Sequence, residues 1–166
     1  MNITPTSNEK IFSTDILLVT KTDLKGKITY ANRAFMQIVN MNEDELIGAP
    51  HNIIRHPDMP KIIFKFLWSY LQRGDEIHAY VKNISKDGSF YWVLANVTPS
   101  QNNNNKVIGY HSSRRKPTPE ALEIIIPLYE KLLQAEKSGG VQKSEAIMTD
   151  LLNEKGVTYD EFILSI

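Results

Sequence analysis

Residues 83–92 read NISKDGSFYW, and this stretch is the clearest indication of the fold. Lys86-Asp87-Gly88 is a tight-turn sequence, because aspartate and glycine accept the backbone conformations that such turns require. Branched and aromatic residues on both sides predict strands over 77–84 and 90–97, paired as an antiparallel hairpin. A further strand is expected over 107–113, beyond the polar loop QNNNNK. The centre of the chain is therefore predicted to be antiparallel sheet.

The chain before this hairpin predicts two more strands and three short helices. Residues 15–20 are rich in branched apolar side chains, and the following KTDLKGKITYAN turns at Gly26 into a second strand. Asn32 then caps a short helix, and NEDELIGA at 42–49 suggests a second helical turn. Apolar residues at helical spacing predict a third helix over 61–72.

This order of elements predicts an α+β fold: a five-stranded antiparallel sheet with short helices on one face, plus C-terminal helices. Strands joined by hairpins, with the helices segregated between them, leave room for a pocket between the sheet and the helices that cover it. The pattern indicates a ligand-sensing shape.

The remainder of the chain predicts helices only. TPE at 118–120 is a start signal, SGG at 138–140 is a stop signal, and Pro127 is expected to kink or split the helix between them. A second helix is expected from Ser144 and a short third one from about Thr158. Their apolar stripes fit two roles, covering the sheet or docking a second copy or a receptor partner.

Composition excludes several classes of protein. The 166 residues include 19 basic and 19 acidic ones, so no net charge attracts the protein to nucleic acid. Cysteine is absent, which excludes disulfides, thiolate metal sites and a catalytic thiol. No apolar run could span a membrane, and MNITPTSNEK lacks the apolar segment of a signal peptide. We expect a cytoplasmic protein without direct membrane insertion.

The segment PHNIIRHPDMP at 50–60 concentrates unusual polar residues before an apolar helix. It places the cation Arg55, the imidazole of His56 and the carboxylate of Asp58 among prolines. In one interpretation the prolines set a structured loop and Asp58 caps the next helix. In the other, the three side chains form the polar wall of a ligand site.

Two strings resemble the PAS domain family: DLKGKITYAN at 23–32, its opening hairpin, and NISKDGSFYW at 83–92, its central strands. The longer strings PHNIIRHPDMPKIIFKFLW, VKNISKDGSFYWVLANVTP and IGYHSSR are similar to the PAS domain of Aer-type energy-taxis receptors. That similarity covers roughly residues 13–133. A chain that stops here resembles the stand-alone, CetB-like half of bipartite energy-taxis systems.

The resemblance implies three parts: a polar, mobile tail at 1–12, a PAS sensor domain at 13–116 and a helical extension at 117–166. It also implies a redox sensor that binds FAD non-covalently and signals to a membrane-bound chemotaxis receptor-like partner, CetA-like, at the inner face of the membrane. A homodimer is an alternative assembly. The residues themselves do not separate FAD from FMN.

Carried over by motif, Arg55, His56 and Asp58 would lie beside the cofactor, with Trp68 on the following helix. Asn83 matches the strand asparagine that faces the polar edge of the ring in flavin-binding members of the family. This role is chemically sensible, because an amide both donates and accepts hydrogen bonds.

Two further cofactor candidates are less direct. His78 stands where Aer-type sequences often have a tryptophan, and Asn32 has the alternative role of a helix cap. For Trp68, the alternative is packing in the core.

Two other functions remain open on this fold. A haem-binding gas sensor would use His78 or His56 as its ligand, and a ligand-free interaction module would fill its pocket with side chains. No phosphate-binding loop, nucleophile elbow or histidine metal motif is present, so we expect neither an enzyme nor a metal site.

Overall fold

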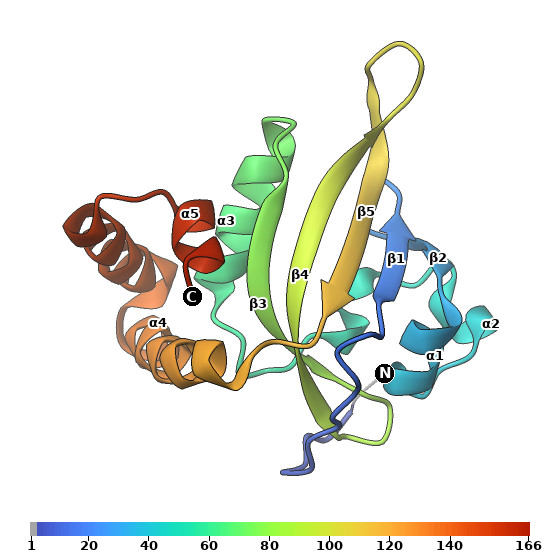
Figure 1. Ribbon diagram of the computed structural model, residues 1–166, viewed down its shortest axis with the longest axis horizontal. Coiled ribbons are helices and arrows are strands. Elements are labelled where there is room, and N and C mark those ends of the chain that lie inside the picture. Colours follow the sequence, from blue (N-terminus) through green and yellow to red (C-terminus); the bar gives the residue numbers. More distant parts are fainter. Residues whose placement is uncertain (1–2) are drawn as a thin grey trace.

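The computed structural model describes residues 3–166 and confirms the predicted α+β fold (Figure 1). Five strands form a single sheet in the order β2-β1-β5-β4-β3, and every neighbouring pair is antiparallel. The elements are β1 (Leu18–Thr22), β2 (Ile28–Ala31), α1 (Arg33–Val39), α2 (Glu43–Leu46), the 3-10 helix η1 (His51–Ile54), α3 (Lys61–Gln72), β3 (Ile77–Ile84), β4 (Phe90–Gln101), β5 (Val107–Arg115), α4 (Pro119–Lys155) and α5 (Tyr159–Leu164).

The hairpin predicted from residues 83–92 is present, and its turn also holds the N-terminal segment. The amide of Thr6 donates to the carbonyl of Gly88 over 2.8 Å, and the amide of Lys10 donates to that of Phe90 over 2.7 Å. Gly88 has a φ of 85°, and a Cβ there would lie 2.3 Å from the carbonyl oxygen of Thr4. Position 88 therefore requires glycine for two reasons, its positive φ and the close approach of the Thr4 carbonyl. Within the segment expected to be a mobile tail, residues 6–10 pair with the hairpin instead, and residues 1 and 2 lie outside the described part of the chain.

The short helices begin where their capping residues predict. The Asn32 side chain accepts from the amide of Phe35 and begins α1. Asn42 and Glu45 form a complete capping box at α2. These caps satisfy amides that the first helical turn leaves without partners. The three helices that the sequence predicts between β2 and β3 are present as α1, α2 and α3, and the 3-10 helix η1 is an additional element there.

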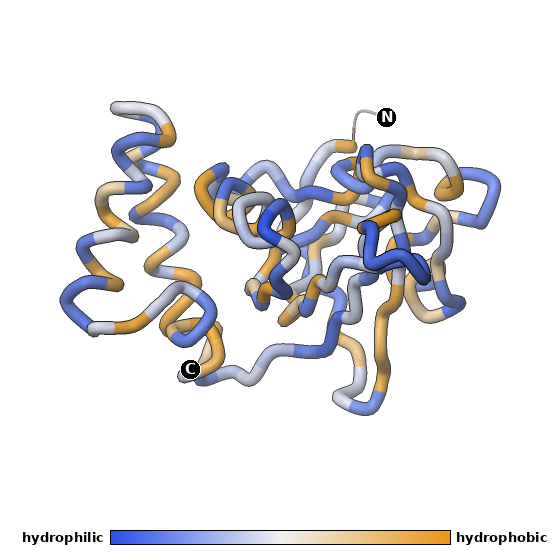
Figure 2. The backbone as a smooth tube through the Cα atoms, turned by 90° about the horizontal axis from the view of Figure 1, so that it is seen from above, coloured by the Kyte–Doolittle hydropathy of each residue, from blue (hydrophilic) through white to orange (hydrophobic). Residues whose placement is uncertain are grey.

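The long helix α4 is two arms separated by a break at glycine, not at proline. Gly139 and Gly140 have non-helical backbone angles, and Gly140 has a φ of 72°. Pro127, which was expected to kink or split the helix, does not split it, since the backbone on both sides of it stays helical. Glycine adopts the positive φ of such a break at low steric cost, whereas the fixed φ of proline is itself compatible with a helix. Figure 2 shows the two arms side by side at one end of the molecule.

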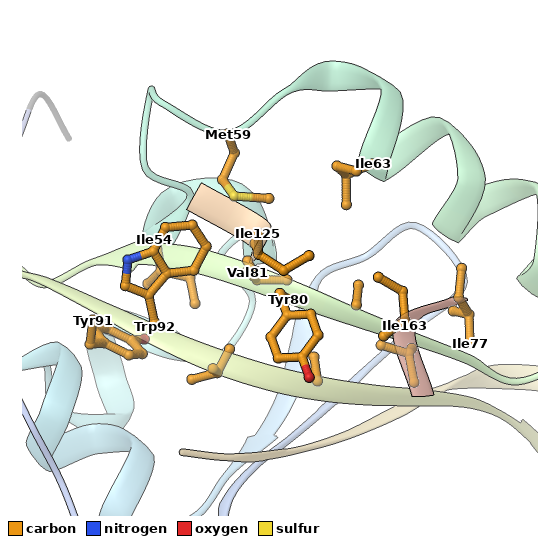
Figure 3. Close-up of a cluster of buried hydrophobic side chains, with 14 of the residues drawn as sticks. Ile54, Met59, Ile63, Ile77, Tyr80, Val81, Tyr91, Trp92, Ile125 and Ile163 are labelled. Atoms are coloured by element: carbon orange, nitrogen blue, oxygen red, sulfur yellow. The ribbon is translucent and has the colours of Figure 1, made fainter. Parts of the chain in front are cut away.

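The C-terminal helices pack onto the sheet and onto α3. Figure 3 shows Ile125 of α4 and Ile163 of α5 beside Ile77 and Tyr80 of β3. Ile125 is fully buried, and Ile163 is 1% exposed. The Glu136 carboxylate accepts from the first two amides of α3, each over 3.0 Å. Of the two roles considered for these helices, covering the sheet is the one that the structure shows.

β3 is an edge strand whose outward backbone groups are occupied by other segments. The amide of His78 donates to Asp160, and the carbonyl of Tyr80 accepts from the Tyr129 hydroxyl over 2.7 Å. Further along, the carbonyl of Lys82 accepts from the amide of His56. An open edge pairs readily with other chains, so this cover protects the sheet from such pairing.

Candidate functional site

A cavity of about 230 Å³ lies between the sheet and the helices that cover it. Strands β1, β3, β4 and β5 form one side of it, and η1, α3 and the turn after β1 form the other. Alternate residues point the same way along a strand, which is why 81 and 83 line the cavity together, as do 110, 112 and 114. The volume is slightly below the range of about 300–1,000 Å³ usual for small-molecule sites.

Aromatic side chains form part of the wall. Trp68 of α3 is 37% exposed, and its ring meets that of Tyr110 edge to face, with centroids 5.6 Å apart. The Arg55 guanidinium lies over the ring of Phe64, 3.4 Å from its centroid. All four residues line the cavity. Flat rings of this kind suit a planar ligand.

Asn83 brings an amide to the inner face of β3. Asn83 is 3% exposed, and its backbone forms an isolated antiparallel bridge with that of Arg55. Asparagine is depleted in strands, and a buried amide requires hydrogen-bond partners. Its place in the cavity wall makes a ligand one source of those partners.

A buried arginine holds the deepest polar cluster. The Nη2 of Arg114 donates to the Thr20 hydroxyl over 2.9 Å and lies 2.7 Å from Nε2 of His51. Its guanidinium also lies over the face of Phe35, 5.4 Å from the ring centroid. The other terminal nitrogen, Nη1, is buried without a partner, as is the Ser112 hydroxyl.

His51 is neutral at physiological pH. Burial, with the charges of Arg114 and Arg55 acting in the same direction, lowers its pKa to about 3. Since Nη2 of Arg114 can only donate, Nε2 of His51 accepts, and the ring proton lies on Nδ1. The neutral His51 ring therefore accepts a hydrogen bond from Arg114 and holds its guanidinium in place.

Acid should destabilise the protein through His51. The unfolded histidine takes up a proton below its ordinary pKa of 6.5, whereas the folded one stays neutral down to about 3. The contribution of neutral His51 to the unfolding free energy is thus complete above pH 6.5. It is lost as the pH falls, by about 1.4 kcal/mol per pH unit. Between pH 6.5 and 5, the wild type should lose about 2 kcal/mol more unfolding free energy than His51→Gln, measured by urea denaturation. Parallel pH curves for the two proteins would contradict this.

Three of the seven residues carried over from the resemblance line the cavity: Arg55, Trp68 and Asn83. The other four do not. Asn32 caps α1, and its side chain also bonds the backbone of Leu17 and Val19. The Nδ1 of His78 lies 3.2 Å from the Asp160 carboxylate.

His56 and Asp58 lie in the loop before α3 and do not line the cavity. His56 is 3% exposed, and its Nδ1 accepts from the amide of Asp58. The Asp58 carboxylate is largely exposed and pairs with Lys82 over 2.9 Å. These residues build the loop, as the first interpretation of this segment has it, but Asp58 does not cap α3: the residue before that helix is Pro60, and Glu136 accepts from its first amides.

Side-chain alternation explains both outcomes. His78 and Asn83 lie five positions apart on β3, so they point to opposite faces. Lys82, the partner of Asp58, likewise faces away from Asn83. The same rule could have found the residues that the sequence analysis missed. A cation at 114, two residues from Ser112 on an inward-facing strand position, is an unusual signal.

No group of three or more potential metal ligands occurs within residues 3–166. Nor does any helix in that part of the chain combine the length and the apolarity that a membrane crossing needs.

A five-stranded antiparallel sheet with helices over one face and a partly polar cavity between them is the architecture of small sensor domains. The family described as PAS fold matches residues 28–114, and the chain belongs to this family.

Among curated proteins, the aerotaxis receptor of Escherichia coli (strain K12) is 40% identical over 129 residues, which cover 78% of this chain and 25% of the receptor. The bacterioopsin transcriptional activator of Halobacterium salinarum (strain ATCC 700922 / JCM 11081 / NRC-1) is 25% identical over 89 residues, covering 54% of this chain and 13% of that protein. The chain thus spans a quarter or less of these relatives.

Solved structures agree on the fold. The light-state structure of the blue-light photoreceptor Aureochrome1 LOV superposes with a TM-score of 0.61 at 17% identity, covering 66% of this chain and 88% of that one. A light-oxygen-voltage domain studied with a flavin analogue gives a TM-score of 0.59 at 18% identity, covering 69% and 86%. At these identities the likeness establishes architecture alone.

Proposed function

We propose that this chain is a redox sensor that binds FAD non-covalently and catalyses no reaction of its own. The observation that carries the proposal is the buried Asn83 amide in the wall of a cavity between sheet and helices. The identity of 40% to an aerotaxis receptor supports energy taxis as the process that the sensor serves.

The residues of the cavity fit a flavin. Its apolar walls suit a planar ring, and the Asn83 amide can both donate to and accept from an imide edge. Lys25 and Arg55 also line the cavity, and their exposed cations suit the phosphates of a dinucleotide. The cavity volume of about 230 Å³ would hold the ring, with the remaining ligand extending outward. A bound flavin would supply reversible electron uptake.

The sheet offers a route for the signal. Asn83 faces the cavity, while Tyr80 on the same strand accepts a hydrogen bond from Tyr129 of α4. His78 contacts Asp160 of α5. A change in the hydrogen bonds of Asn83 would therefore shift β3 relative to helices that reach the surface, biasing a two-state equilibrium.

The proposed receiver of the signal is a membrane-bound, CetA-like chemotaxis receptor, so this chain would act in the cytoplasm at the inner face of the membrane as a CetB-like subunit. Chromatography of the two purified proteins together, with oxidised and then reduced sensor, tests this pairing. A complex whose affinity differs between the two states supports it, and absence of any complex contradicts it.

Haem is less well supported. His56 and His78, the ligands considered for it, do not line the cavity. His51 does, but its Nε2 already accepts from Arg114. A ligand-free module is also less well supported, because side chains do not fill the cavity.

The test is an absorption spectrum of the purified protein, before and after dithionite, with the released chromophore identified by chromatography. Flavin bands that bleach on reduction, with FAD released, are expected. A Soret band, or a colourless protein that refuses added FAD, would overturn the proposal.

Replacing Asn83 by alanine should weaken FAD binding by about 5- to 150-fold. Loss of one or two buried hydrogen bonds costs about 1–3 kcal/mol, and each 1.4 kcal/mol is about tenfold in affinity. Fluorescence titration of the apoprotein with FAD measures this. Lys82→Gln is the matched control, because it alters the neighbouring residue on the opposite face of β3 and should leave the affinity within about twofold. Equal affinities for both variants would contradict the assignment of Asn83.

A further inference from the structure

The cavity is lined by positive charge without any negative charge. Lys25, Arg55 and Arg114 are among its lining residues, and neither aspartate nor glutamate is. Lys25 and Arg55 are exposed, whereas Arg114 is only 4% exposed. Water can stabilise the two outer cations, but it reaches the inner one poorly.

Arg114 has no acidic partner among the described residues. Its hydrogen bonds go to Thr20 and His51, both uncharged, and both are made by the same nitrogen, Nη2. A buried cation without a countercharge is costly, and burial, partly offset by Tyr91, lowers the pKa of Arg114 to about 10. The contacts of Nη2 fix the guanidinium in place and leave Nη1 without a partner.

Other donors near Nη1 are also without partners. The Ser112 hydroxyl, two residues away on the same face of β5, is buried and unpaired. So is the hydroxyl of Tyr91, a fully buried residue close enough to Arg114 for the guanidinium charge to lower the phenol pKa against the effect of burial. Buried polar groups in native proteins nearly always have partners. Of these unpaired groups, Nη1 and the Ser112 hydroxyl belong to residues that line the cavity, and unpaired donors there indicate a ligand that presents acceptors or negative charge.

We propose that Arg114 contacts the inner edge of the ligand and makes the cavity prefer a ring that carries negative charge over the same ring uncharged. The inference rests on the flavin proposed above and assigns Arg114 as the residue that sets its reduction potential. Two electrons from an external reductant and one proton from solvent enter the oxidised ring and leave it with one net negative charge. Arg114 stabilises that charge, so reduction becomes easier.

The decisive variant is Arg114→Gln, whose amide can still donate to Thr20 and His51 but carries no charge. It should bind oxidised FAD within about threefold of the wild type, and the ratio of its dissociation constants for reduced and oxidised FAD should rise at least tenfold. For a two-electron couple, a tenfold change is a midpoint shift of about 30 mV to more negative potential. Arg114→Lys keeps the charge and should stay within about 10 mV of the wild type.

The readout is a spectroelectrochemical titration of each FAD-loaded protein, together with its FAD occupancy. Arg55→Gln is the matched control, because it removes an exposed cation of the same cavity and should shift the potential less than Arg114→Gln does. An Arg114→Gln protein that binds FAD with the wild-type potential would overturn the inference and leave the proposed function intact. A wild type that binds no FAD would overturn the proposed function first. If Arg114→Gln does not fold, a shift of 30 mV or more in Arg114→Lys would count against the inference, since the charge is kept.

Discussion

A chain ending at Lys116 should not persist as a folded monomer. It would lack α4 and α5, whose side chains make up a large share of the buried core: Ala121, Ile125, Tyr129, Leu132, Met148, Tyr159, Phe162 and Ile163. Truncating one large apolar core residue costs about 2–5 kcal/mol, and a domain has about 5–15 kcal/mol in total. Loss of the whole set exceeds that margin.

The deletion would also uncover the edge of β3. The amide of His78 and the carbonyl of Tyr80 would lose their partners Asp160 and Tyr129, so the exposed strand could pair with another copy. Urea denaturation followed by circular dichroism, with light scattering to give the mass, measures both effects. A monomer with a cooperative transition like that of the full chain would contradict the prediction and would support a separable domain at 13–116.

Two point variants of α4 provide the matched comparison. Leu132 is fully buried, and Leu132→Ala should cost about 2–5 kcal/mol of unfolding free energy. Ile124 on the same helix is 47% exposed, and Ile124→Ala should cost about 0.5 kcal/mol or less. Similar costs for the two variants would mean that the helix does not pack as described.

Phe35→Ala should have the second-largest effect, about 3–5 kcal/mol of unfolding free energy. Phe35 is completely buried, and its ring supports two polar groups of the cavity. The Arg114 guanidinium lies over it, and the His51 ring centroid is 6.1 Å away. Removing the ring leaves a void beside a buried cation. We therefore expect FAD binding to weaken as well.

Urea denaturation and FAD titration of the same protein measure the two effects of Phe35→Ala. Tyr30→Ala is the control, because Tyr30 is 46% exposed and its loss should change the unfolding free energy by about 0.5 kcal/mol or less. A cost below about 1 kcal/mol for Phe35→Ala would contradict the packing described here.

The fold could be predicted largely from local signals. The turn at 86–88, the caps Asn32 and Asn42 and the glycine pair at 139–140 each act over a few residues, and each is where the sequence places it. The features of the fold that local sequence signals did not predict are those that depend on contacts between residues far apart in the chain. The N-terminal segment is held by a turn about 80 residues away, which no local pattern reveals.

The site was harder to predict for a geometric reason. The resemblance assigned residues by their place in a motif, whereas lining the cavity depends on the direction in which each side chain points. Arg55 lines it and His56 next to it does not, and Asn83 lines it while His78 does not. Arg114 was missed because its significance lies in what surrounds it. The sequence shows the arginine but cannot show that its partners are uncharged.

The cover over β3 also has a consequence for how the protein is made. The groups that occupy its outer backbone include Asp160 and Tyr129, which leave the ribosome long after the strand itself. The chain has 82 residues from Ser85 to Ile166, and synthesis at about 5–20 residues per second takes about 4–16 s for them. During that time a nascent chain carries an open strand edge. Crowded synthesis on neighbouring ribosomes should therefore favour misassembly, and a chaperone that binds extended strands should raise the yield of folded protein.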